Sequence, residues 1–116
     1  CVTEAAATVF TDDPPRFMAR VPHGYSDTSR IRADLAAGGF RNPADIAAVE
    51  TRSRAKSARF AALGFCQGTP LRSEIEARDA SRLDDVIDAA TGTIARRFGN
   101  DAVDGRMLAN VITIRK

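Results

Sequence analysis

The chain has 116 residues, enough for one domain of about 100 to 150 residues or for part of one. Its 17 basic and 15 acidic residues nearly balance, and they do not form the basic stripe that is typical of nucleic-acid-binding proteins. No apolar run approaches the roughly 20 residues that a membrane-spanning helix needs. We therefore expect a globular protein that binds neither nucleic acid nor membrane. With no Trp and one Tyr, its core should be helix-rich and modest in size.

Cysteine and histidine usage limits the chemistry. Cys1 and Cys66 are the only cysteines, and His23 is the only histidine. We expect reduced thiols and a cytoplasmic location, because Cys66 lies in an apolar segment and Cys1 at an end of the chain. These three residues do not make a zinc site. A first residue that is Cys and not Met is typical of a fragment or of a processed lipoprotein, and the helical composition of residues 2–7 favours the fragment.

The first third of the chain predicts two helices. Residues 1–10 are apolar on one side and are followed by a double proline, which ends a helix. The stretch P-H-G-Y at residues 22–25 predicts a tight turn, after which Asp27 caps the second helix. Gly38-Gly39 ends that helix, and Phe40 is placed to fold back against it.

The remaining two thirds predict two strands with helices between them. Residues 46–52 form the expected first strand, and residues 107–115 the second. The second strand is apolar on both faces and therefore needs cover on both. Between the strands, residues 83–98 carry apolar side chains at the spacing of an amphipathic helix.

The segment Ser57 to Arg78 predicts a pair of short helices joined by a turn. Ser57 suits the N-cap of the first helix, and Thr69 that of the second, with the following proline in the first helical position. In the second helix the aliphatic residues face inward, and Glu74 and Arg78 are spaced to pair on the outside.

The amino-acid sequence of this segment resembles that of a known protein family. F-C-Q-G-T-P-L-R-S-E-I-E-A-R at residues 65–78 resembles the segment between the last two strands of bacterial class I S-adenosylmethionine-dependent methyltransferases. The resemblance extends over nearly the whole chain. It includes P-P-R-F-M-A-R-V-P-H-G-Y, I-R-A-D-L-A-A-G-G-F and D-G-R-M-L-A-N-V-I-T-I, which are residues 14–25, 31–40 and 104–114.

This resemblance implies an α/β fold, in which residues 1–116 form the carboxy-terminal part of a Rossmann-like sheet with helices and an antiparallel strand pair. The two strands would be the sixth and seventh of seven, and residues 57–79 would form a helical cap. The seventh strand would lie between the fifth and sixth. With one of its neighbours missing, its open edge predicts poor stability or self-association of the isolated chain.

The resemblance also implies methyl transfer from S-adenosylmethionine to a small molecule. The cofactor is bound mainly by a glycine-rich turn after an early strand of such enzymes. The chain has no such turn, because Gly38-Gly39 follows a helix. We therefore expect the cofactor-binding half to be absent and the chain to be inactive alone.

Five residues are the candidates for substrate binding. His23 and Tyr25 lie in the turn that would face the substrate opening, where His23 can act as a general base; the alternative is a plain turn with Tyr25 packed on the next helix. Phe65, Cys66 and Gln67 would line the pocket from the cap, and the alternative is ordinary core and turn. The sequence does not name a catalytic residue.

Two other classes of function remain open. The chain can be a complete, non-enzymatic α+β module that binds a ligand or a partner. It can also be a small lipid-anchored envelope protein attached through Cys1.

Overall fold

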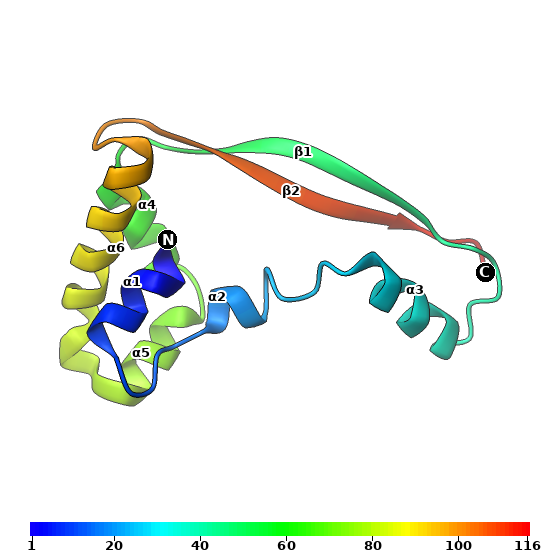
Figure 1. Ribbon diagram of the computed structural model, residues 1–116, viewed down its shortest axis with the longest axis horizontal. Helices are drawn as coiled ribbons and strands as arrows, with labels where there is room; N and C mark the ends of the chain where they lie inside the picture. The colour runs from blue at the N-terminus through cyan, green and yellow to red at the C-terminus, as the bar shows by residue number, and fades with distance from the viewer.

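The computed structural model describes all 116 residues as a mixed chain of helices and one two-stranded antiparallel sheet (Figure 1). In chain order the elements are α1 (Val2–Val9), α2 (Phe17–Arg20), α3 (Thr28–Ala37), β1 (Asp45–Ala55), α4 (Ala58–Gln67), α5 (Leu71–Asp79), a 3-10 turn (Ala80–Arg82), α6 (Leu83–Phe98) and β2 (Val103–Thr113). Figure 1 shows two regions, a bundle of helices at one end and a long ribbon of two strands that reaches α3 at the other. The molecule measures 49 × 31 × 19 Å.

The helix ends follow the caps that the sequence predicts. The side chain of Ser57 accepts a hydrogen bond from the Phe60 N–H at 3.1 Å, and Asp27 does the same for two N–H groups of α3. Thr69 Oγ1 accepts from the Leu71 N–H at 3.2 Å, although α5 begins one residue later than predicted. At the end of α3, Gly39 has φ +92° and the Phe40 N–H reaches the Leu35 carbonyl. This is the Schellman pattern, so the predicted fold-back of Phe40 is confirmed.

The helical bundle is built from α1, α4, α5 and α6 around one core of 14 buried residues. On α4 the buried face consists of Ala58, Ala62 and Cys66, which are small enough for close approach to the long helix α6. Larger side chains complete the core from the neighbouring helices. They are Leu71 and Ile75 of α5 and Val86, Ile87 and Ile94 of α6. The inward positions predicted for α5, and most of those predicted for α6, are confirmed.

The predicted pair of Glu74 and Arg78 is wrong. The Arg78 guanidinium bonds the Asp13 carboxylate at 3.1 Å, and Glu74 pairs with Arg20. Partners that are distant in sequence are preferred because the segment around the double proline and α2 lies against α5. The side chains of Glu74 and Arg78 therefore reach that segment. These exposed ion pairs fix the path of the chain between α1 and α2 more than they add stability.

The two predicted strands are confirmed and are longer than expected. β1 and β2 pair over 11 residues each, from Asp45 opposite Thr113 to Ala55 opposite Val103. Residues that lie opposite each other share a face, so one face of the ribbon carries even-numbered residues and the other carries odd-numbered ones. We call these the even face and the odd face.

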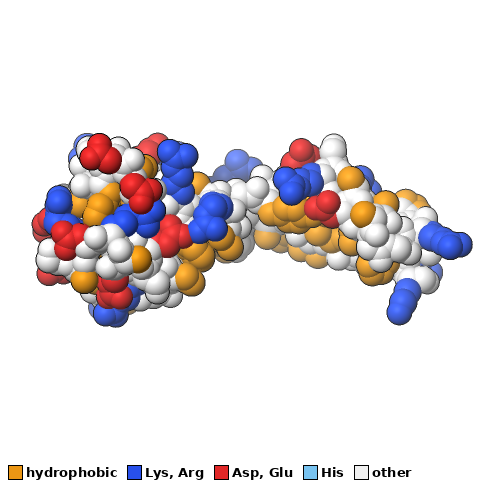
Figure 2. Space-filling view, turned by 90° about the horizontal axis from the view of Figure 1, so that it is seen from below, with side chains coloured by type: hydrophobic (Ala, Val, Ile, Leu, Met, Phe, Trp, Pro, Cys, Tyr) orange, Lys and Arg blue, Asp and Glu red, His pale blue; other side chains and the backbone are white.

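The ribbon is largely bare, meaning that most of its two faces is exposed to solvent and not covered by helices. At its far end α3 approaches the even face, where the Asn110 amide donates to the Ser26 carbonyl at 3.2 Å. At its base the odd face enters the bundle through buried Val103. Between these contacts large apolar side chains stay exposed on both faces, from 40% for Ile112 to 55% for Leu108. On the odd face they are Val49, Met107 and Val111. Figure 2 shows hydrophobic side chains gathered on the stretch between the two ends of the molecule.

Candidate functional site

His23 and Tyr25 lie in the predicted turn, but they point to different surroundings. A Cβ on Gly24 would lie 2.2 Å from the Arg20 carbonyl oxygen, so this tight turn requires glycine. The His23 N–H donates to the Met18 carbonyl at 3.1 Å, and its exposed side chain has no partner in the chain. The Tyr25 hydroxyl donates to Asp34 on α3 at 2.6 Å. This hydrogen bond is the main cause that raises the pKa of Tyr25 above its ordinary value.

The other three candidates follow one another at the end of α4. Cys66 is fully buried, and burial raises the pKa of its thiol to about 11. At neutral pH it is therefore a protonated core side chain that is closed to ligands in this structure. Phe65 is half-buried against the core, whereas Gln67 is exposed at the last position of the helix.

The structure brings these two groups to neighbouring turns without forming one pocket from them. The Thr69 hydroxyl donates to the Phe65 carbonyl at 2.7 Å and lies 3.9 Å from the Met18 sulfur. The turn after α4 therefore contacts α2, the helix that leads to His23. Tyr25, in contrast, belongs to the start of α3. None of the five residues lines either of the two cavities described below.

One cavity lies between the bundle and the chain segment before α2. It has a volume of about 370 Å³ and is lined without any hydrophobic side chain except the ring of Pro14. Its remaining lining residues are Asp12, Asp13, Arg16, Arg20, Glu74 and Arg78. Most of these charges are already paired with one another across the cavity, as described for Arg20 and Arg78. This cavity is therefore an ion-paired seam between two segments.

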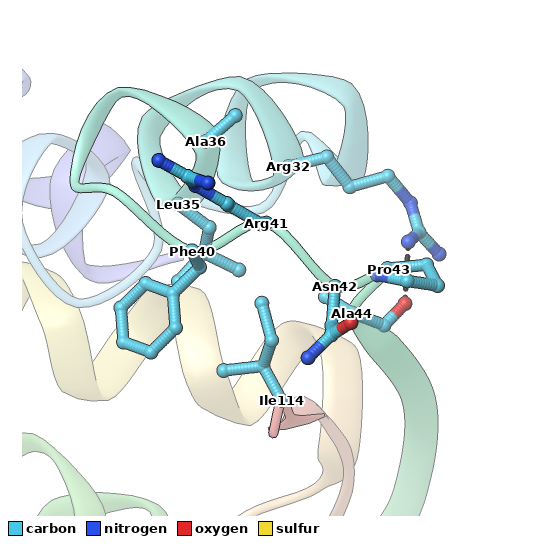
Figure 3. Close-up of a pocket in the computed structure, with 9 residues that line it drawn as sticks. All are labelled: Arg32, Leu35, Ala36, Phe40, Arg41, Asn42, Pro43, Ala44 and Ile114. Carbon is cyan, nitrogen blue, oxygen red and sulfur yellow. Dashed lines mark hydrogen bonds between the residues drawn. The ribbon is translucent and has the colours of Figure 1, made fainter. Parts of the chain in front are cut away.

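The second cavity lies at the far end of the ribbon, beneath the end of α3, and has a volume of about 340 Å³ (Figure 3). Its apolar wall contains Leu35, Phe40 and Ile114, and Figure 3 shows the Phe40 ring and Ile114 side by side at its opening. Arg32 and Arg41 supply the charge, and no acidic residue lines the cavity. The sequence analysis missed this site because Ile114 is distant in sequence from the other eight lining residues. Its one available signal was the fold-back of Phe40.

Paired charges also mark the base of the ribbon. Arg52 Nε donates to Asp104 Oδ1 at 2.8 Å across the two strands, and Arg54 lies 3.4 Å from the other carboxylate oxygen. The hydrogen bond from Arg52 is the largest cause that lowers the pKa of Asp104. Glu50 and Arg106 form a further cross-strand pair at 2.7 Å. These groups fix the register, since each is placed opposite or diagonal to its partner.

Two general properties complete the description. No three or more His, Cys, Asp or Glu side chains come together in a way that would hold a metal ion. The helices are all too short or too polar to cross a membrane.

Comparison of the chain with models of known protein families, with curated proteins and with solved structures finds no match.

Proposed function

We propose that the chain is the carboxy-terminal, substrate-side portion of a class I S-adenosylmethionine-dependent methyltransferase that acts on a small molecule. The sequence resemblance over residues 14–25, 31–40, 65–78 and 104–114 suggests it. The order of helices and the antiparallel pairing of β1 with β2 are compatible with the last two strands of such a sheet.

The bare ribbon is the observation that carries the proposal. Two strands alone are marginally stable in water, and these two expose Leu108 and Val111 by 55% and 49% on opposite faces. Strands that are apolar on both faces belong to sheets covered by helices on both sides. A larger Rossmann-like sheet would provide that cover, together with a neighbour for the open edge of β2.

The residues present do not fit the cofactor. β1 continues through Lys56 directly into α4, without a glycine-rich turn that would let the backbone approach a nucleoside. S-adenosylmethionine would therefore be bound mainly by another part of the enzyme, and we assign no residue of this chain to it.

The part of this chain would be to enclose and orient the methyl acceptor. Methyl transfer depends on holding the acceptor atom close to the methyl group with water excluded. Three of the five candidates remain available for this on geometric grounds. His23 and Gln67 are exposed near the neighbouring turns of α2 and α4, and Phe65 is half-buried beside them. Tyr25 is held by Asp34, and Cys66 is closed off in the core.

The test begins with the coding DNA upstream of Cys1. We expect the reading frame to continue through a strand, a glycine-rich turn and a helix. The protein from the whole frame should bind S-adenosylmethionine in calorimetry and transfer a labelled methyl group to a component of a small-molecule extract. A whole-frame protein that folds but does not bind the cofactor would refute the proposal.

A substitution of His23 tests the proposed role of a single residue. If His23 takes a proton from the acceptor, His23→Gln should lower kcat and kcat/KM, the loss expected when a general base is removed. Arg16→Gln, an exposed change that precedes α2, is the matched control and should leave both unchanged. An unchanged kcat in His23→Gln would limit His23 to the turn.

A second candidate is a non-enzymatic module that binds a partner. The bare ribbon favours it as well, because exposed apolar patches mark interaction sites. The same experiment separates the two, since a binding module would lack the strand, turn and helix upstream and would not bind the cofactor.

A further inference from the structure

We propose that the cavity beneath the end of α3 binds a small organic anion, a carboxylate on an apolar body. This site lies at the end of the ribbon away from the helical bundle (Figures 1 and 3) and is independent of the proposed methyl transfer. Its volume of about 340 Å³ is within the usual range for small-molecule sites.

The charge in the cavity is unbalanced. Arg32 donates through Nη1 to the Ala44 carbonyl at 2.5 Å, a neutral partner that leaves its positive charge uncompensated. The Arg41 side chain has no hydrogen-bonding partner in the chain, and its guanidinium lies near Ala36 in Figure 3, on the opposite side of the lining from that of Arg32. Most other arginines of this protein are paired with a carboxylate, as Arg52, Arg59 and Arg72 are. Two guanidinium groups that belong to the lining of one cavity and have no carboxylate partner favour an anion.

Apart from the Ala44 carbonyl, which accepts from Arg32, the nearby backbone acceptors at the end of α3 are already occupied. The carbonyls that end α3 already accept N–H groups from Gly38, Gly39 and Phe40. The Asn42 side-chain amide donates to the Arg115 carbonyl at 3.2 Å and so connects the loop to the end of the ribbon. The acids nearest along the chain, Asp34 and Asp45, do not line the cavity.

The apolar wall favours an anion with an apolar body over a simple inorganic ion. Leu35 and Ile114 are half-buried, while the Phe40 ring is 36% exposed and forms one side of the opening. An alkyl or aromatic body that lies against Phe40 and Ile114 would cover this surface while its carboxylate meets the guanidinium of Arg41. The arrangement of an apolar floor with a few placed polar groups is typical of ligand sites.

Octanoate is the probe for this site. Its binding is measured by calorimetry and by changes in the amide chemical shifts of the protein. We expect saturable binding with shifts confined to residues 32–44 and 112–116. Octanol, which keeps the chain and lacks the charge, and sulfate, which keeps charge and lacks the chain, should both bind at least tenfold more weakly. Shifts that spread over Val49, Met107 and Leu108 would mean adsorption to the bare ribbon and would overturn the proposal.

Substitutions at the cavity sharpen the test. Arg41→Gln should weaken octanoate binding by roughly tenfold, the effect of one charge-assisted hydrogen bond. Because this side chain has no partner, its loss should not unfold the protein, and unchanged circular dichroism should verify that. Arg16→Gln, another exposed arginine that lies outside this cavity, is the matched control and should bind octanoate normally. Equal affinity in both variants would refute the site.

Discussion

The helical bundle and the ribbon use apolar residues in opposite ways. In the bundle, Ile75, Val86 and Ile87 are buried to 0% or 1% exposure, and alanine faces bring the helices close together. In the ribbon, aliphatic side chains of similar size stand 40% to 55% exposed on both faces. The bundle therefore has its own core, whereas the middle of the ribbon has none. Contacts within the chain therefore stabilise the two regions to different extents.

Core truncation should produce the largest effect. Ile87→Ala removes buried methyl groups next to α4 and should lower the free energy of unfolding by about 2 to 5 kcal/mol. Val111→Ala, at an exposed ribbon position, should change it by no more than about 0.5 kcal/mol. Urea denaturation followed by circular dichroism measures both. Equal losses would mean that the ribbon is buried in solution.

Self-association through the open edge of β2 should be the next largest effect. An exposed apolar strand edge pairs with other strands, so sedimentation velocity of the chain should show a concentration-dependent increase in mass. Val111→Lys should suppress that increase by placing a charge on the edge strand. Phe60→Lys is the control, because Phe60 is 52% exposed on α4, outside the ribbon. If both variants associate like the wild type, the ribbon edge is not responsible.

Alanine substitutions at two glycines should change the stability of the chain by smaller amounts and in opposite directions. Gly39 has φ +92°, so Gly39→Ala should destabilise the chain by about 1 kcal/mol although nothing lies within 4 Å of the added methyl. Gly64 lies in the middle of α4 with equally free space, and Gly64→Ala should stabilise by about 0.5 to 1 kcal/mol. Thermal melts of the two variants test both signs. A destabilised Gly64→Ala would show that α4 packs against something on its exposed side.

The charge at the base of the ribbon should give the smallest effect, and the pH dependence of that effect should appear only in acid. The folded-state pKa of Asp104 lies below its unfolded value because of the bond from Arg52. The carboxylate therefore contributes stability above its unfolded pKa of about 3.9 and loses that contribution as the pH falls through the lowered folded value. Asp104→Asn should flatten the stability profile below about pH 4. Asp101→Asn, in the neighbouring loop, should leave the profile unchanged.

The local features were readable from the sequence, and the long-range ones were less so. Caps at Ser57 and Asp27 and the fold-back of Phe40 depend on residues a few positions apart, and they were predicted. The partner of Arg78 was not, because the neighbouring Glu74 competes with a carboxylate 65 positions away. Strand positions were predicted. The solvent exposure of the ribbon was not, because it depends on where the helices pack in three dimensions.

The candidate site shows the same limit. Apolar and small residues at the end of α4 do not by themselves distinguish a pocket from a core, and the full burial of Cys66 is seen only in the structure. The cavity under α3 joins Ile114 to residues 32–44, a contact that depends on the pairing of β1 with β2. Pattern and spacing within a single segment do not reveal such a site.

Hydrogen exchange of the chain, followed residue by residue in dilute solution, tests the contrast between bundle and ribbon most directly. Amides of α4 and α6 should exchange slowly, at rates that report global unfolding, because their helices share the buried core. Amides of β2 should alternate, with slow exchange only where they bond to β1 and fast exchange along the open edge. Slow exchange at every amide of β2 in a monomer would contradict an uncovered ribbon.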